Sequence, residues 1–252
     1  MSLRVITWNM GYATPSSYKS HVDEAWEALL SNEPDVAFVQ EGRVPDWARA
    51  SRTIFYAPAY PHSPWGSAIV TRDELTPEIV QHKSLPWLQY FFGRVVLAAV
   101  TVDSRELLIG SIHAQATELN AAKLDKKSLE ATKRRWTKNV WALDLIFHDL
   151  VLFLQDRSFI VGGDLNADPI MDETFSKVGG NRSFFTDLGM TGLLNCSSSP
   201  QQTFFAPGKK PYQLDYLFAS SDWHDRLSRF TAPLYDGFKT LSDHVPLVAE
   251  FS

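Results

Sequence analysis

Short apolar runs alternate with turn-forming segments along this chain, and several runs end in a polar cluster. Leu3–Trp8 is rich in residues that favour β-structure, and Asp35–Glu41 contains a continuous apolar sequence typical of a strand buried on both faces. We therefore predict two buried strands in the first 41 residues. Further strands are expected at Thr53–Tyr56, Trp65–Thr71, Arg94–Val102, Leu107–His113, Ser158–Val161, Gln213–Ala219 and Val245–Phe251.

Apolar residues spaced three and four apart indicate two helices. The first should follow the first strand, where Ser20 and Asp23 resemble a capping box. The clearest helix is predicted from about Ser128 to Gln155, and one of its faces must pack on a sheet. Its apolar positions are Trp136, Val140, Leu143, Phe147, Leu150 and Leu154.

The order of these elements is strand, helix, several hairpin-joined strands, helix and further strands. This order suits an α/β (α+β) fold in which two mostly antiparallel sheets pack together between helices, a four-layer αββα sandwich. The chain has 252 residues, of which 44% are apolar, and it contains no recognisable linker or repeat. We expect a single domain over residues 1–252.

Composition excludes some classes of protein. A formal charge of −5 provides no global attraction to nucleic acid or anionic membranes, although a local basic patch could still provide it. Cys196 is the sole cysteine, which rules out an intramolecular disulfide and any cysteine-cluster metal site. Neither a signal peptide nor a membrane-spanning apolar stretch is recognisable. We expect a cytoplasmic protein with no integral membrane association and no obligate protein partner.

Two of the polar clusters lie at the ends of the first two strands. Asn9 follows the first strand, and Glu41 ends the second. A carboxylate at such a position is paired, bound to a metal or turned to water, and asparagine is also a common turn residue. Neither residue decides the chemistry alone.

A third cluster, Gly162-Gly163-Asp164-Leu165-Asn166, follows another short strand. Paired glycines let the backbone turn tightly, and Asp164 and Asn166 can project from one side of it. Together they can present a carboxylate and an amide to a water molecule and a phosphate. An isolated Gly-Asp-x-Asn sequence is equally often an ordinary turn.

The C-terminal cluster Ser242-Asp243-His244 places an acid beside a histidine. A carboxylate that holds an imidazole in a fixed tautomer is the usual arrangement for a general base, so we expect Asp243 to orient His244. His113 ends a predicted strand, and Asp215 lies inside an otherwise apolar one. Because a charge at such a position needs a partner or a metal, Asp215 is a further candidate.

Taken in order, these sequences resemble the endonuclease/exonuclease/phosphatase superfamily. This superfamily contains Mg²⁺-dependent phosphoesterases, among them DNase I-like nucleases, apurinic endonucleases, sphingomyelinases and inositol-phosphate phosphatases. Six motifs occur in the family order between residues 8 and 244. They are Trp8-Asn9, Gln40-Glu41, His113, Gly163-Asp164-Leu165-Asn166, Asp215-Tyr216 and Ser242-Asp243-His244.

The resemblance implies a metal site and a reaction. Glu41 and Asn9, with Asp243 as a further ligand, are expected to hold Mg²⁺, or alternatively Mn²⁺, since hard cations prefer oxygen ligands. Asp164 and Asn166 should orient the attacking water and a phosphate oxygen.

The resemblance also implies roles for the two histidines. His244, steadied by Asp243, should either remove a proton or stabilise the phosphorane. His113 should lie near the leaving oxygen as an acid or hydrogen-bond donor, and Asp215 should orient His113 or its neighbours.

Substrate recognition is less well specified. Arg94 occupies a position similar to that of a phosphate-contacting arginine of the family, although a solvated arginine at the start of a strand is an alternative. The basic segment Lys123–Lys138 could attract a polyanion or could be a solvated helix face. Four aromatic residues before Arg94 could form a substrate surface or belong to the core. They are Trp87, Tyr90, Phe91 and Phe92.

Three functions fit the sequence. The first is a Mg²⁺-dependent phosphodiesterase of nuclease type, with nucleic acid as its phosphate-ester substrate. The second is a phosphatase or phosphodiesterase acting on inositol phosphates or phospholipid headgroups. The third is a catalytically silent domain that binds a phosphorylated partner, and the presence of Glu41, Asp164, Asn166, Asp243 and His244 argues against it.

Overall fold

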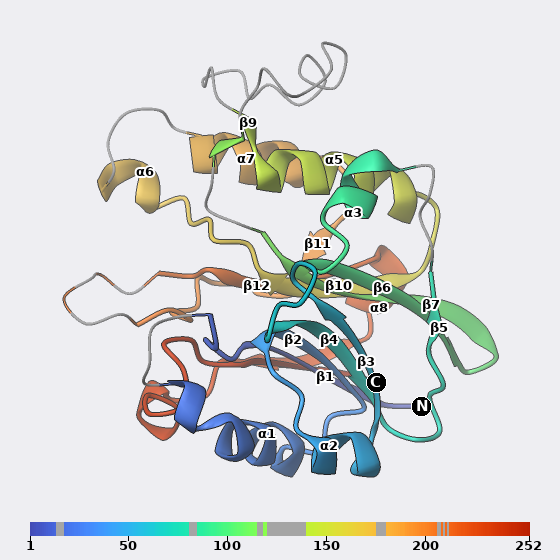
Figure 1. Ribbon diagram of the computed structural model, residues 1–252. Helices are drawn as coiled ribbons and strands as arrows, with labels where there is room; N and C mark the ends of the chain where they lie inside the picture. The colour runs from blue at the N-terminus through green and yellow to red at the C-terminus, as the bar shows by residue number, and fades with distance from the viewer. Residues whose placement is uncertain are drawn as a thin grey trace.

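The computed structural model describes residues 1–13, 18–80, 85–114, 118–119, 140–174, 180–205, 208, 210 and 212–252. Two six-stranded mixed sheets lie face to face, and helices cover both outer faces (Figure 1). The predicted four-layer sandwich is therefore confirmed.

Each sheet is mostly antiparallel, as expected. The first sheet has the order β13 (Leu227–Thr231), β14 (Leu247–Phe251), β1 (Leu3–Asn9), β2 (Val36–Gly42), β4 (Gly66–Thr71) and β3 (Thr53–Pro58). The second has the order β11 (Leu194–Asn195), β12 (Asp215–Ala219), β10 (Phe159–Asp164), β7 (Arg105–His113), β6 (Val95–Val102) and β5 (Glu78–Ile79). A separate pair is formed by β8 (Glu118–Leu119) and β9 (Val140–Trp141).

The helices divide between the two outer faces (Figure 1). The first sheet is covered by α1 (Val22–Ser31) and α2 (Asp46–Ser51), and the second by α3 (Pro86–Tyr90), α5 (Ala142–Leu154) and α7 (Gly180–Leu188). Shorter turns are α6 (Met171–Thr174), α8 (Ser221–His224), η1 (Tyr18–Ser20) and η3 (Tyr235–Gly237). None of the described helices has the length and apolar character that crossing a bilayer requires.

A parallel pair of strands occupies the centre of each sheet. β1 pairs with β2, β7 pairs with β10, and the other pairings within the two sheets are antiparallel. The chain follows α1 between the first pair and α5 between the second, as parallel crossovers require. The two sheets thus share a topology that no sequence repeat reveals. Their parallel strands end, and their antiparallel neighbours begin, at one edge of the sandwich.

One expectation for the helices was wrong, and another was confirmed only in part. Ser20 ends the turn η1, and α1 begins at Val22 with no side-chain hydrogen bond at its N-cap residue, His21, so the predicted capping box does not form. The helix predicted from Ser128 begins only at Ala142 among the described residues, because the preceding Val140–Trp141 pairs with β8. Residues 120–139 lie outside the described part of the chain.

The apolar layer between the sheets leads to a prediction about Cys196. Its side chain is buried in that layer, and burial raises the pKa of the thiol to about 12. The thiolate fraction at pH 8 should therefore be roughly a thousandfold below that of an exposed cysteine. We expect the folded protein to react very slowly with a disulfide reagent such as DTNB, and to react fully in denaturant. Rapid labelling of the folded protein would contradict this packing.

Candidate active site

The predicted site residues come together because side chains alternate between the two faces of a strand. In each central strand, the series that faces the other sheet begins with apolar residues and ends with polar ones. These inner-facing series are Leu3, Val5, Thr7, Asn9 in β1; Val36, Phe38, Gln40 in β2; Leu107, Ile109, Ser111, His113 in β7; and Ile160, Gly162, Asp164 in β10. Polar groups from both sheets therefore meet where the apolar layer stops.

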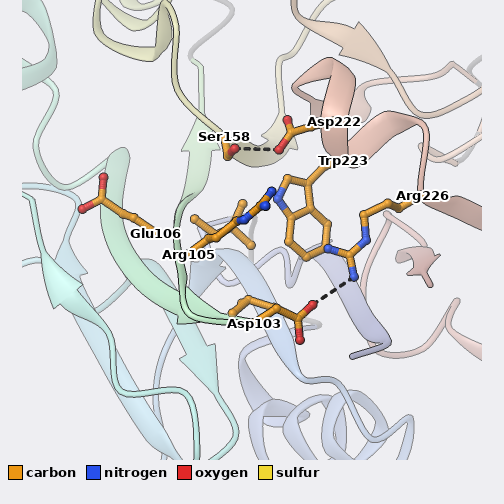
Figure 2. A pocket seen from close by; sticks show the side chains of 9 residues that line it. Asp103, Arg105, Glu106, Ser158, Asp222, Trp223 and Arg226 are labelled. Atoms are coloured by element: carbon orange, nitrogen blue, oxygen red, sulfur yellow. Dashed lines mark hydrogen bonds and ion pairs between the residues drawn. The ribbon is translucent and has the colours of Figure 1, made fainter.

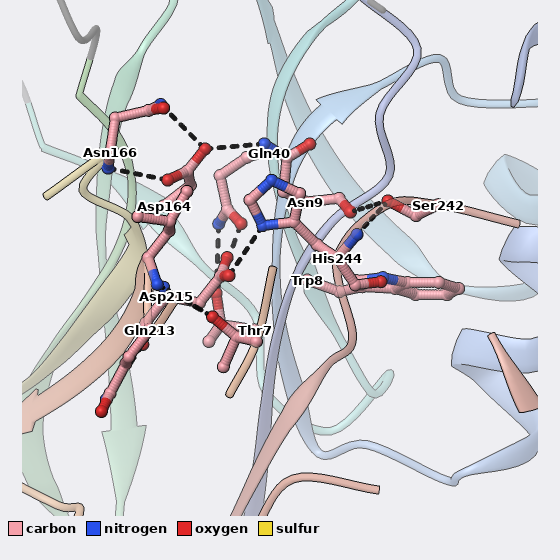
Figure 3. Close-up of polar contacts among 12 residues, drawn as sticks. Thr7, Trp8, Asn9, Gln40, Asp164, Asn166, Gln213, Asp215, Ser242 and His244 are labelled. Atoms are coloured by element: carbon pink, nitrogen blue, oxygen red, sulfur yellow. Dashed lines mark hydrogen bonds and ion pairs between the residues drawn. The ribbon is translucent and has the colours of Figure 1, made fainter. Parts of the chain in front are cut away.

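Gln40 joins the two sheets at this boundary. Its Nε2 donates to Ser111 Oγ at 3.0 Å across the interface. The same Nε2 lies 3.2 Å from Thr7 Oγ1 on the neighbouring strand (Figure 3). Ser111 Oγ in turn donates to the carbonyl of Val39 at 3.1 Å. All of these groups are buried, so each bond also satisfies a polar atom that water cannot reach.

Glu41 reaches the site through a backbone irregularity. It follows the inner-facing Gln40, and regular alternation would direct its side chain toward the helices. Instead, the register between β2 and β4 shifts between Val39 and Gly42, and Glu41 has a φ of +48°. Such a bulge redirects a side chain. As a result, Glu41 Oε1 lies 3.2 Å from His113 Nε2, and Oε2 accepts a hydrogen bond from Ala13 N.

Asp164 is held by amide groups from two segments. Oδ2 accepts hydrogen bonds from Asn9 Nδ2 at 2.8 Å and Asn166 Nδ2 at 2.9 Å, while Oδ1 accepts one from Asn166 N at 2.8 Å (Figure 3). Asn166 also donates to the carbonyl of Ala114. Burial raises the pKa of the Asp164 carboxyl to about 6, although the neighbouring histidines oppose this shift.

His244 is paired with Asp215, so the expected pairing with Asp243 is wrong. Asp215 Oδ2 lies 2.7 Å from His244 Nδ1, and Asp215 is fully buried (Figure 3). Burial favours the neutral imidazole, but the charge of Asp215 and its hydrogen bond raise the pKa of His244 to about 10. Residues 243 and 244 are neighbours in sequence, yet consecutive side chains of an extended segment point in different directions.

His113 lies beside Glu41 and Arg94. Arg94 Nη1 is 3.4 Å from His113 Nδ1, and because a guanidinium can only donate, Nδ1 must be the acceptor. The ring proton then resides on Nε2, which faces Glu41 Oε1. Burial would raise the pKa of Glu41, but the hydrogen bond from His113 and the charge of His244 leave it below its usual value. Asp215, which was expected to orient His113 or its neighbours, pairs with His244 and not with His113.

Asp243 belongs to a segment that packs against the end of β1. Ser242 Oγ donates to the carbonyl of Asn9 at 2.8 Å, which fixes this segment against the end of β1 (Figure 3). Gly11 donates to Asn9 Oδ1 and lies against the Asp243 carboxylate. Burial raises the pKa of Asp243, and the negative charges of Glu41 and Asp215 raise it further. Glu41 and Asp243 therefore repel one another, and Asn9 adds an amide oxygen, a donor set suited to a hard cation.

A second group of potential metal ligands, Asp164, Asp215 and His244, differs from the first because it contains a histidine paired with a carboxylate. Among the described residues, ligand atoms of Asp164, Asp215 and His244 lie within 4.8 Å of one another. However, Asp215 Oδ2 and His244 Nδ1 form a hydrogen-bonded ion pair at 2.7 Å, and a metal bound here would have to displace the proton that the two residues share.

Three residues that the sequence analysis did not identify as site candidates also lie at this edge. Trp65 precedes β4, and its ring lies 5.8 Å from that of His113. The ring of Phe204 lies 5.0 Å from that of His244, and Thr203 Oγ1 accepts a hydrogen bond from the backbone N–H of Asp215. Trp65 could have been found by extending the strand-end argument to the start of an antiparallel strand. Phe204 and Thr203 lie outside the strands and carried no such signal.

The sequence analysis considered two segments as substrate surfaces, a basic one and an aromatic one. The basic segment Lys123–Lys138 lies outside the described residues. Of the four aromatic residues before Arg94, two pack in the outer core of the second sheet and two are exposed. Phe91 is buried and Trp87 half-buried, whereas Tyr90 is 72% and Phe92 is 45% exposed.

A cavity of about 300 Å³ lies at the opposite end of the sandwich (Figure 2). It is bordered by the turn between β6 and β7, where Asp103 pairs with Arg226 at 3.3 Å. Across it, Ser158 donates to Asp222 at 2.6 Å. The predicted site residues do not line this cavity, so the candidate active site is the polar edge formed by the strand ends.

The sequence profile of the Endonuclease/Exonuclease/phosphatase family matches residues 6–244. The chain therefore belongs to this family, whose members are generally dependent on divalent metals. A search of curated protein sequences finds no match.

Solved structures of family members share the fold at low sequence identity. The 3′ phosphatase NExo from Neisseria, bound to a product DNA hairpin, is 18% identical with a TM-score of 0.70, and the similarity covers 99% of both chains. An AP endonuclease from Archaeoglobus fulgidus is 18% identical with a TM-score of 0.67, again over 99% of both chains. The AP endonuclease LMAP from Leishmania major is 16% identical with a TM-score of 0.68, over 99% of this chain and 87% of that one.

The observed histidine pairing can be tested by substituting each candidate acid. Asp215→Asn removes the neighbouring charge and should lower the pKa of His244 from about 10 toward its ordinary value, whereas Asp243→Asn should lower it less. The measurement is an NMR titration of the His244 ring in each variant. A larger shift in Asp243→Asn than in Asp215→Asn would contradict the pairing.

Proposed function

We propose that this protein is a Mg²⁺-dependent phosphoesterase that hydrolyses phosphodiester bonds, with a nuclease type of activity. The observation that carries the proposal is the gathering of an Asp215–His244 ion pair, an amide-held Asp164 and a Glu41–His113 pair at one polar edge. Phosphoryl transfer requires a centre that stabilises negative charge on phosphate oxygens and positions a nucleophile. The three groups together meet both requirements.

Glu41, Asn9 and Asp243 are the residues that would hold the metal. Their donor atoms are all oxygens, and the mutual repulsion of the two carboxylates is the electrostatic condition that a cation relieves. The Glu41 side chain is 16% exposed, so water can reach the site. Once bound, Mg²⁺ supplies charge neutralisation at the scissile phosphate. Mn²⁺ suits the same oxygen ligands.

Asp164 is proposed to orient and deprotonate the attacking water. The raised pKa of this carboxyl, about 6, makes it a better proton acceptor than an ordinary aspartate while leaving it ionised at neutral pH. Asn9 and Asn166 fix the carboxylate through hydrogen bonds, so its direction is set before substrate binds. The Asn166 amide would also contact a phosphate oxygen.

His244 is proposed to stabilise the negative charge of the phosphorane. With Asp215 at 2.7 Å, the ring is an imidazolium at neutral pH and has no vacant nitrogen with which to accept a proton. Of the two roles that the family resemblance left open, the geometry thus supports electrostatic stabilisation. His113 carries its ring proton on Nε2 and would donate it toward the leaving oxygen, and Arg94 would contact a phosphate oxygen.

The solved relatives support nucleic acid as the substrate. The proteins named above are AP endonucleases and a 3′ phosphatase with bound DNA product. The phosphatase also favours a second candidate activity, removal of a terminal phosphate from nucleic acid. Release of inorganic phosphate would distinguish this activity from cleavage within a strand.

Nicking of supercoiled plasmid tests the proposal. The wild-type protein should nick in Mg²⁺ and not in EDTA, and His244→Ala should lower the rate by about 10²-fold or more. His244→Ala also leaves Asp215 buried without a counter-charge, which can cost about 3–5 kcal/mol. His244→Asn is therefore measured in parallel, since its amide can donate to Asp215.

His224→Asn is the matched control for nicking, because His224 belongs to α8 at the other end of β12. Thermal melts establish that each variant is folded. Undiminished nicking by folded His244→Asn would exclude the proposed role of His244.

Metal binding is tested by Glu41→Ala. Loss of this ligand should weaken Mg²⁺ binding roughly tenfold or more, since even outer-shell partners of metal ligands contribute that much. Isothermal titration calorimetry and the Mg²⁺ concentration for half-maximal activity both report the change. Glu106→Gln, an exposed acid at the start of β7, serves as the control. Equal Mg²⁺ affinity in Glu41→Ala and the control would rule out Glu41 as a ligand.

A further inference from the structure

The loop between β3 and β4 forms an ordered projection beside His113. It runs from Ala59 to Trp65. Pro58 precedes it, and Pro61 and Pro64 lie within it. Ala59 N donates to the carbonyl of Trp65 at 3.0 Å, and the hydroxyl of Ser63 donates to the same carbonyl at 2.6 Å. Prolines and internal hydrogen bonds restrict the backbone, so the aromatic residues of this loop are held in place before any ligand binds.

A turn from the other sheet packs directly against this loop. A Cβ atom placed on Gly93 would lie 1.8 Å from the carbonyl oxygen of Pro58, so only glycine permits this approach. Gly93 precedes Arg94, which is thereby brought to the loop from the start of β6. The projection is thus built from both sheets, as is the catalytic edge that it borders.

Trp65 lies at the centre of this arrangement. Its ring centre is 6.1 Å from that of Tyr60, 5.8 Å from that of His113 and 5.3 Å from the guanidinium carbon of Arg94. Trp65 is itself half-buried by these neighbours. Tyr60, in contrast, is 53% exposed.

We propose that Tyr60 stacks on an unpaired nucleobase adjacent to the scissile phosphate, and that the preferred substrate is therefore single-stranded nucleic acid. Trp65, whose ring lies near those of both Tyr60 and His113, supports the Tyr60 ring, and Arg94 binds the neighbouring phosphate. This assignment rests on the proposed nuclease function. Aromatic rings that protrude next to a cationic group are the features that bind single strands, because every base offers a face for stacking.

The same geometry disfavours an intact duplex. In a duplex each base is already stacked and paired, so reaching Tyr60 would require a base to leave the helix at a cost of a few kcal/mol. A single strand does not incur this cost. Phe92, which is 45% exposed and directly precedes Gly93, places a second exposed ring in the adjoining turn.

The test compares steady-state cleavage of a labelled single-stranded oligonucleotide with that of the same sequence in a duplex. The wild type should favour the single strand in kcat/KM. Tyr60→Ala should raise KM for the single strand by about tenfold and change kcat by less than about twofold, because a stacking contact binds ground and transition states alike. Tyr60→Phe retains the ring and should restore KM.

Trp47→Ala is the matched control. Trp47 lies on α2, is 39% exposed and donates a hydrogen bond to Asp23 on α1. The substitution therefore removes an exposed aromatic ring from the outer helical layer, away from the candidate active site. This variant should leave the kinetics unchanged. Because Tyr60 is exposed, its alanine variant should melt at the wild-type temperature, and melting curves check this.

Each result decides the proposal. Cleavage by Tyr60→Ala with the KM of Trp47→Ala would overturn the stacking role and leave the proposed nuclease function intact. An equal rise in KM for the single strand and the duplex would place Tyr60 against the sugar-phosphate backbone and also overturn stacking. A folded wild-type protein that cleaves neither substrate in Mg²⁺ would overturn the nuclease function and this inference with it.

Discussion

The hydrogen bond from Gln40 Nε2 to Ser111 Oγ is the interaction on which the geometry of the site depends. It joins the two sheets at the level where their shared apolar layer ends. Just beyond it, a Cβ atom on Gly163 would lie 1.9 Å from the carbonyl of Ile112 and 2.9 Å from Gln40 Nε2, and Gly163 has a φ of +147°. Glycine at this position lets β10 approach closely enough for Asp164 to meet Asn9 from the other sheet.

The acidic residues at this edge have different surroundings, so we assign them different roles. Four acids lie there in different surroundings: Asp215 faces an imidazolium, Asp164 accepts hydrogen bonds from amides, Glu41 faces His113, and Asp243 experiences both the charge of His244 and the opposing charges of Glu41 and Asp215. A buried carboxylate without compensation is unfavourable, so these partners fix the role that each acid can take. Glu41 and Asp243, whose charges repel one another, are the acids that we propose for the cation, and Asp164 is the acid that we propose for the attacking water.

The positions of the strands and of the candidate site residues followed from the sequence, because apolar runs and the polar residues that end them are local features. The partners of those residues did not follow. Asp215 and His244 lie 29 positions apart in the sequence. They meet because β12 and the segment before β14 both begin at the same edge of the sandwich. The bulge that turns Glu41 inward is a matter of register between two strands.

The errors at the helices have the same origin. Val140 continued a helical spacing, yet pairing with β8 placed it in a strand. Tyr60 and Trp65 carried no motif at all, and their place beside His113 became evident only from the packing of one loop against Gly93. Local patterns specify elements, whereas contacts between distant segments decide which side chains share a site.

The central claim is that one composite site binds the metal on Glu41, Asn9 and Asp243 while the Asp215–His244 ion pair stays intact beside it. Anomalous scattering from crystals grown with Mn²⁺ and a mononucleotide product tests this most directly. The account predicts an Mn²⁺ peak on Glu41 with the product phosphate between it and His244. A peak among Asp164, Asp215 and His244, with Glu41 still bonded to His113, would contradict the account.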